Sequence, residues 1–301
     1  MISLPKFSST FSLGLAFIFF GATSNAATCC VWRVTNAPAP FYLVGTMHAL
    51  SGHDYPLPAG YNQALHDSNR LIFEIKPDPR SDFSKKLARA AAYPKGDDIR
   101  RHVHPKTWQI LSVNFRAVGL LGRSIRIGDY YLEQGMQQLR PWAIAYIFYG
   151  VRGYNDVYSG LGVDNDLAFE AKRMHKELAG LETDDEHVEV MGGMNDIESE
   201  LILLEAIVYR DKKRADFNEA RAAWKRGDTA ALWADHQRFR NLDPGADVRL
   251  LDVRNVKWVP RIRAEINSGK PTSIVVGANH MLGPNGLIAL LQRNGFKFEQ
   301  L

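Results

Sequence analysis

The sequence predicts an α/β fold: a central mixed, mostly parallel sheet flanked by helices, with a large helical insertion. Two apolar runs, residues 41–44 and 273–276, each lead into Gly-x-x-His, a pattern that indicates buried strands ending at a ligand-binding loop. A loop, a helix over 285–293 and a strand over 296–301 follow the second run. This β-α-β order favours parallel pairing with a right-handed crossover.

The N-terminal segment is predicted to be a secretory signal peptide. Lys6 precedes an apolar run over 11–20, and small residues follow up to Ala27. The run is shorter than the roughly 18 residues that a membrane span needs, so an uncleaved anchor is the weaker alternative. We therefore expect cleavage after Ala26, an exported protein that is periplasmic or secreted, and one domain over residues 27–301 without a transmembrane span.

The cysteine content and the charge restrict the possible classes of protein. The two cysteines, Cys29 and Cys30, are adjacent and could close only a strained ring, so we expect unpaired or exchanging thiols outside the core. A lipid on Cys29 is less expected, because residues 26–28 lack the leucine that precedes lipidated cysteines. The formal net charge of +4 is spread among acidic residues, which gives no indication of nucleic-acid binding.

Helices and strands are predicted in order along the rest of the chain. Residues 31–35 should form a hairpin with 41–46, and a helix over 59–69 leads to a strand over 70–75. Between the insertions, expected at about 80–160 and 184–250, a helix over 165–176 leads to a strand over 177–183. Period 3.6 predicts further helices at 83–92, 105–118, 128–139, 141–149, 184–191, 196–214, 216–227, 229–240 and 255–267, and a polar loop at 243–247.

Three chemically active side chains accompany the predicted strands. His48 and His280 end the two Gly-x-x-His runs, and Glu74 lies inside an apolar strand, where a carboxylate is costly to bury unless it is paired or bound to a metal. Parallel sheets bind ligands at the carboxyl ends of their strands, so these residues are expected to form one site. In the structural alternative each histidine caps a loop, and Glu74 pairs with an arginine such as Arg254.

Several short motifs, in order along residues 31–301, together resemble the TraB/GumN family, which includes the Tiki proteases. They are Tyr42–His48, Pro56–Pro58, Phe73–Ile75, Arg140–Trp142, Gly162–Asp164, Gly180–Thr183, Arg254–Asn255 and Val276–Gly283. The resemblance implies an α/β core of the erythromycin-esterase/ChaN-like type. For the Tiki branch it also implies a metal-dependent peptidase with His48, Glu74 and His280 as ligands.

Two imidazoles and one carboxylate leave a position for water on a divalent zinc, manganese, cobalt or iron ion, among which this ligand set does not choose. A metal-bound water would then attack a peptide or small-molecule substrate. The ChaN-like relatives imply instead a periplasmic haem- or iron-binding protein. A third alternative is a non-enzymatic accessory protein of envelope polysaccharide production.

A second group of residues is expected around these ligands. Asp164 and Glu182 could orient a ligand histidine or act as general base, and Asp164 could equally cap a helix. Arg254 and Asn255 could stabilise an oxyanion or bind substrate, or tie a helix to the sheet. Thr46 and Asn279 could donate hydrogen bonds to substrate, or have ordinary turn roles.

The remaining histidines are expected to have no role in the site. His102 and His104 should lie in a solvated loop before Pro105, while His53 is near enough in sequence to approach His48. We expect His66, His175, His187 and His236 on helix surfaces. No Gly-x-Ser-x-Gly or phosphate-binding glycine loop occurs, so covalent catalysis is not predicted.

Overall fold

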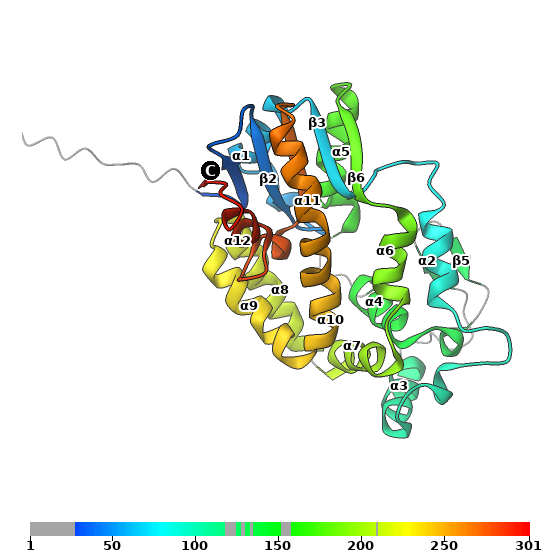
Figure 1. The fold of residues 1–301 in the computed structure, drawn as a ribbon. Helices are drawn as coiled ribbons and strands as arrows, with labels where there is room; N and C mark the ends of the chain where they lie inside the picture. Colours follow the sequence, from blue (N-terminus) through cyan, green and yellow to red (C-terminus); the bar gives the residue numbers. More distant parts are fainter. Residues whose placement is uncertain (1–27, 118–124, 128–129, 133–134, 152–157, 209) are drawn as a thin grey trace, which may run out of the picture.

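The computed structural model describes residues 28–301, apart from 118–124, 128–129, 133–134, 152–157 and 209 (Figure 1). The predicted signal peptide therefore lies outside the described residues. Among these, six strands form one sheet in the order β6-β3-β7-β2-β1-β8. The strands are β1 (Val31–Val34), β2 (Phe41–Thr46), β3 (Arg70–Ile75), β6 (Glu177–Glu182), β7 (Thr272–Gly277) and β8 (Phe298–Gln300).

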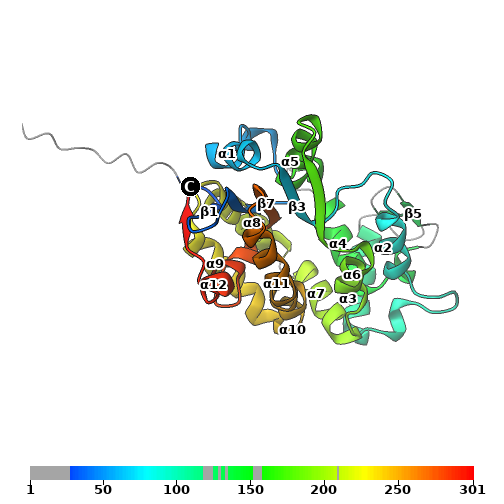
Figure 2. The ribbon, with the colours of Figure 1, turned by 45° about the horizontal axis from the view of Figure 1, so that its top comes forward.

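The sheet is mostly parallel, as predicted. β6, β3, β7 and β2 run in parallel, and β1 pairs with β2 as the expected antiparallel hairpin. Helices α1 (Ala59–Asp67) and α5 (Val163–Arg173) cover one face, and α11 (Val253–Asn267) and α12 (Leu287–Gln292) cover the other (Figure 2). Because both faces are covered, every residue of β2 and β7 is buried.

The remaining long helices form a layer beside and below the sheet (Figure 1). One group surrounds a second apolar core that includes Leu111, Trp142, Ile144 and Leu203. A pair of helices packs instead towards the sheet, where Trp224 joins the main core. The first group is α2 (Phe83–Ala91), α3 (Pro105–Ala117), α4 (Pro141–Val151), α6 (Asp184–Gly192) and α7 (Asp196–Val208), and the pair is α8 (Arg210–Lys225) and α9 (Thr229–Leu242).

Two predictions of local structure are wrong. In the described part of 128–139, where a helix is expected, the chain forms strand β5 (Tyr130–Leu132) and a short 3-10 turn over Met136–Gln138. β5 pairs antiparallel with β4 (Ile125–Ile127), because β-branched and aromatic residues favour strands. The loop expected at 243–247 contains helix α10 (Pro244–Asp247), whose amide at Ala246 is capped by the Asp243 carboxylate. A π-helical turn over Val248–Asp252 then leads into α11.

The predicted parallel pairing of the C-terminal strand with β7 is also wrong. β8 pairs antiparallel with β1 at the sheet edge, since β3 and β2 already occupy both sides of β7. The break predicted near residue 215 is wrong, because this position lies inside α8.

The expectation that the cysteines lie outside the core is wrong as well. Cys29 and Cys30 are free and buried, because β1 lies between β2 and β8 and the residues that enter it are covered. None of the helices in the described ranges is both long and apolar enough to cross a bilayer.

Candidate active site at the carboxyl ends of three strands

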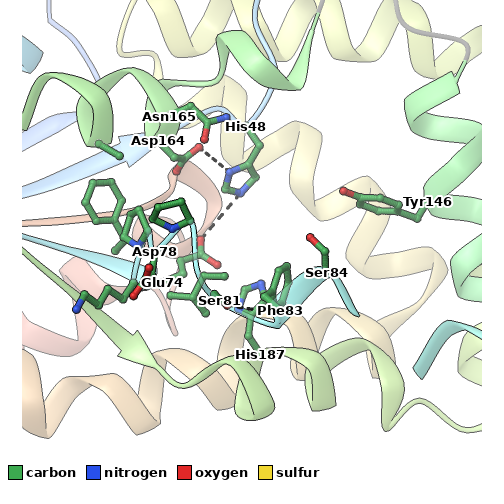
Figure 3. Close-up of a pocket in the computed structure, with 16 residues that line it drawn as sticks. His48, Glu74, Asp78, Ser81, Phe83, Ser84, Tyr146, Asp164, Asn165 and His187 are labelled. Carbon is green, nitrogen blue, oxygen red and sulfur yellow. Dashed lines mark hydrogen bonds and ion pairs between the residues drawn. The ribbon is translucent and has the colours of Figure 1, made fainter. Parts of the chain in front are cut away.

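Three adjacent strands bring His48, Glu74 and His280 together. His48 follows β2, Glu74 lies near the end of β3, and His280 lies in the 3-10 turn after β7. The Nε2 atoms of His48 and His280 are 4.0 and 3.7 Å from Oε1 of Glu74. Figure 3 shows the side chains of His48 and Glu74 facing each other on the wall of a pocket. The side chains predicted to converge are therefore neighbours in space.

The other ring nitrogen of each histidine is held by a side chain behind it. Nδ1 of His48 lies 2.8 Å from Asp164, whose second oxygen accepts from the Thr46 hydroxyl. Nδ1 of His280 lies 2.7 Å from Oδ1 of Asn255. Such partners are typical of metal-binding histidines, because they fix the ring and leave Nε2 as the free lone pair.

The hydrogen bonds of Asn255 determine which ring nitrogen of His280 carries the proton. The amide nitrogen of Asn255 donates to two backbone carbonyls, those of His280 and Asn285, so its oxygen must face Nδ1 of the imidazole. That nitrogen therefore carries the proton and Nε2 is the acceptor. Asn255 is buried and fully engaged in this way, whereas Asn279 is exposed.

Arg254, on α11, connects the site to two carboxylates. Its Nε and Nη2 donate to Glu182, and Nη2 also lies 2.6 Å from Oε2 of Glu74. Its Nη1 donates to the carbonyl of Leu250 and lies 3.2 Å from Nε2 of His280. Because a guanidinium has five N–H groups, these acceptors use all of them. The pairing of Glu74 with Arg254 is the contact expected in the structural alternative.

Two glycines in the sequence motifs allow the side chains and the backbone of the site to lie close together. A Cβ on Gly277 would lie 3.3 Å from Nε2 of His48 and 3.5 Å from Oε1 of Glu74, so the glycine keeps open the space between the ligand atoms. A Cβ on Gly162 would lie 2.3 Å from the carbonyl oxygen of His48. The start of α5 can therefore pack directly under the His48 loop and place Asp164 against the imidazole.

The charges of the site set the protonation of its members. Burial opposes ionisation of Glu74, but the neighbouring His280 and Arg254 outweigh it and lower the pKa of this carboxyl below its ordinary value. Burial lowers the pKa of His280 to about 3 against the attraction of Glu74, so this imidazole is neutral. Asp164 raises the pKa of His48, whose side chain is 66% exposed.

The donor set suits a small divalent cation. Two ligand atoms on one tetrahedral ion lie about 3.4 Å apart, so the observed 3.7 and 4.0 Å are open by a few tenths of an ångström. As they stand, no three His, Cys, Asp or Glu side chains of the described ranges enclose an ion. For His280 to bind a metal ion, Nη1 of Arg254 would have to move away from Nε2 of His280. Nη1 would still donate a hydrogen bond to the carbonyl of Leu250.

Two cavities meet at His48 and Glu74. The first, of about 490 Å³, also contacts Asp164, His187 and Tyr146 (Figure 3). The second, of about 390 Å³, also contacts Thr46, Arg254, Gly277, Asn279 and His280. The predicted site residues therefore lie on the walls of one cleft, or directly behind them.

Three histidines differ from their predictions. His187 lines the first cavity, 2.9 Å from Glu182 and 3.2 Å from Arg254, instead of lying on a helix surface. His236 is buried against Asp247. His102 is half-buried between Asp97 and Asp196 instead of lying in a fully solvated loop.

For His187 the sequence held a usable signal. Thr183 and Glu186 form a capping box that fixes the first turn of α6, so residue 187 faces back towards the end of β6. The exposed positions of His66, His104 and His175 agree with their predictions, and His53, also exposed, contacts neither cavity.

Comparison with known proteins identifies relatives of this chain. The sequence matches the model of the TraB/PrgY/gumN family over residues 30–300. The metalloprotease TIKI2 of Xenopus tropicalis is 23% identical to it, over 89% of this chain and 59% of that relative's length. The chain thus spans less than two thirds of this relative. No solved structure matches it significantly.

Proposed function

The chain belongs to the TraB/PrgY/gumN family, and from this premise we propose that it is a metal-dependent hydrolase that cleaves peptide bonds. The observation that carries the proposal is the paired orientation of the histidines. Both present Nε2 to the same oxygen of Glu74, while both Nδ1 atoms are held from behind. The similarity to a protein named as a metalloprotease supports the same reaction class.

We propose His48, Glu74 and His280 as the metal ligands. When bound, a divalent cation would polarise the substrate carbonyl and lower the pKa of a coordinated water. Asp164 and Asn255 keep the proton on Nδ1 of each imidazole, and Thr46 holds Asp164 in place. We therefore assign Thr46 and Asn255 to positioning rather than to substrate contact, and retain Asn279, exposed in the second cavity, as a substrate contact.

Arg254 keeps Glu74 ionised and fixes its second oxygen. Four of its five N–H groups stay with Glu74, Glu182 and the Leu250 carbonyl even when Nε2 of His280 is released, so we assign it to positioning rather than to an oxyanion hole. Glu74 and Asp164 both line the first cavity, but both oxygens of Asp164 are engaged with Thr46 and His48, so we propose Glu74 as the group that accepts or returns a proton during hydrolysis and Asp164 as a positioning residue.

Metal content tests the ligand set. We expect purified wild-type protein to bind one divalent ion, as measured by mass spectrometry after dialysis, and His48→Ala to lose it. Gly277→Ala should lose it too, since the added methyl group would fill the space between His48 and Glu74. Ala278→Gly, which adds nothing to this space, is the matched control. Wild-type protein without metal, or unchanged occupancy in both ligand-site variants, would contradict the proposal.

A haem-binding role has less support from the geometry. His280 is 3% exposed and its Nε2 faces Glu74 and Arg254, a setting that suits a small ion better than a macrocycle. A Soret shift on haem titration that disappears in His280→Ala would favour the haem alternative.

We also propose export with cleavage after Ala26. Among the described residues, Thr28 donates to the carbonyl of Arg226 and the amide of Cys29 donates to the carbonyl of Leu301, and a chain that begins at Ala27 keeps both contacts. The Cys29 thiol is buried against Gly60, which disfavours lipid attachment there. We expect intact mass spectrometry of protein from the periplasm or medium to give an unmodified chain that begins at Ala27. A full-length or lipid-modified mass would contradict this.

A further inference from the structure

The cleft continues on both sides of the candidate site. His48 and Glu74 belong to the walls of both cavities. The rest of the first wall comes mainly from β3, α2, α4, α5 and α6, and the rest of the second comes from the two motif loops, α8, α9 and α11, so the cleft extends from these side chains towards two different groups of helices. A site that acts on a chain end needs room on one side only, whereas a site that cuts within a chain needs room on both. From this geometry, and resting on the proposed peptidase function, we propose that the cleft binds an extended polypeptide and cuts it internally, between two apolar side chains.

The first cavity has a polar part, which includes Lys76, Ser81 and Asn165, and an apolar part made of rings and aliphatic groups. Phe73 and Ile75 come from the end of β3, Phe83 from the first turn of α2, and Tyr146 from α4. Tyr146 is 56% exposed and faces His48 and Glu74 from the opposite wall (Figure 3). Aromatic walls of this kind contribute a large apolar contact area, so this side fits an aromatic or branched side chain.

The second cavity is also apolar, but its walls are mainly aliphatic. Met47 and Ala278 come from the two motif loops, Leu232 from α9, and Leu250 and Leu251 from the π-helical turn. The difference between the walls allows each side of the cleft to be tested separately.

Most of the charged groups in the cleft are paired within the protein; in the first cavity Lys76 is the exception among the described residues. Glu74 contacts Arg254, Asp164 contacts His48, and in the second cavity Asp235 pairs with Arg238. A substrate therefore meets mostly neutral walls. Since burying an unpaired charge is costly, we expect discrimination against acidic and basic side chains next to the cleaved bond.

Cleavage-site profiling tests this proposal. Mature wild-type protein, supplied with Mn²⁺, Co²⁺ or Zn²⁺, is incubated with two libraries of decapeptides, one with free ends and one with blocked ends, and the products are identified by mass spectrometry. We expect internal cuts flanked by apolar residues. Phe83→Ala should lower kcat/KM about tenfold for aromatic residues on one side of the bond, because lost pocket contacts weaken transition-state binding. Leu251→Ala should lower it for apolar residues on the other side.

Phe169→Ala is the matched control, since this aromatic side chain on α5 is 65% exposed and contacts neither cavity. Removal of single terminal residues, no preference at the flanking positions, or the same shift in both cleft variants would overturn the inference and leave the peptidase function standing. Absence of cleavage of any peptide by metal-loaded protein would instead overturn the proposed function.

Discussion

At the scale of single residues, the site depends on side chains that hold other side chains. Arg254 is the clearest example, because it is buried and bonds to Glu74, Glu182 and His280 from three different segments. Its role differs from the substrate contact that its residue type suggests. A buried cation that neutralises two carboxylates acts first on stability, and on chemistry through Glu74.

Arg254→Ala is therefore expected to destabilise the metal-free protein. Removing the guanidinium leaves two buried carboxylates without their counter-charge, and breaking a buried pair in this way costs about 3–5 kcal/mol. Urea denaturation followed by circular dichroism measures the loss. Arg263→Ala, at an exposed position on the same helix, should change the free energy of unfolding by no more than about 0.5 kcal/mol. Equal stability of the two variants would refute the assigned role.

At the scale of elements, the site is assembled by the docking of helices at strand ends. The start of α5 lies against the backbone of His48, and the amide of Val163 donates to the carbonyl of Met47. α11 supplies Arg254 and Asn255 from the other face of the sheet. Each histidine is thus supported by a helix on a different face, so the two supports can be disturbed separately.

Gly162→Ala should disturb the support of His48. The new methyl group would lie 2.3 Å from the carbonyl oxygen of His48, and overpacking of this kind costs about 1–3 kcal/mol. Because Asp164 would move with α5, metal affinity should also fall about tenfold or more. Thermal unfolding and metal titration measure the two effects. Gly160→Ala is the control, since a Cβ there meets no atom within 4 Å, and a matching loss in that variant would count against the prediction.

At the scale of the whole molecule, the two ends of the described chain close the sheet together. β8 pairs with β1, the amide of Cys29 bonds to Leu301, and the side-chain amide of Gln300 donates to the carbonyl of Cys29. The two cysteines are buried beneath this junction. Their reactivity therefore reports whether the junction is closed.

The thiols are expected to react slowly in the native state. Burial raises the pKa of Cys29 from 9.0 to about 11, so at pH 8 its thiolate fraction is about a hundredfold lower than in the unfolded chain. Because folding disfavours this thiolate, the contribution of the protonated Cys29 thiol to the stability of the native state is fully present below pH 9. This contribution is lost as the pH rises towards 11, where the unfolded chain ionises more readily than the native protein. Titration with a thiol reagent should modify two cysteines in urea and almost none without it. Rapid modification of the native protein would show that the junction opens.

Much of the sheet and the three central site residues could be predicted from the sequence, because strand patterns and motif histidines are local signals. The supports of the site could not. Arg254 and Asn255 stand out in the sequence as motif residues, but their saturation with hydrogen bonds depends on acceptors up to 180 residues away in sequence. His187 and His236 were placed on surfaces because helical periodicity does not show which other element covers a given face.

The sequence by itself therefore determined the fold class, the central strands, and the choice of His48, Glu74 and His280 as the proposed metal ligands. Only the tertiary structure decided that both Nε2 atoms turn to the same oxygen of Glu74, that Arg254 is used within the protein, and that β8 closes the edge beside β1. The physical reason is that strand and helix patterns arise from neighbours in the chain. Ring orientation, charge neutralisation and edge pairing arise from contacts between segments that only folding brings together.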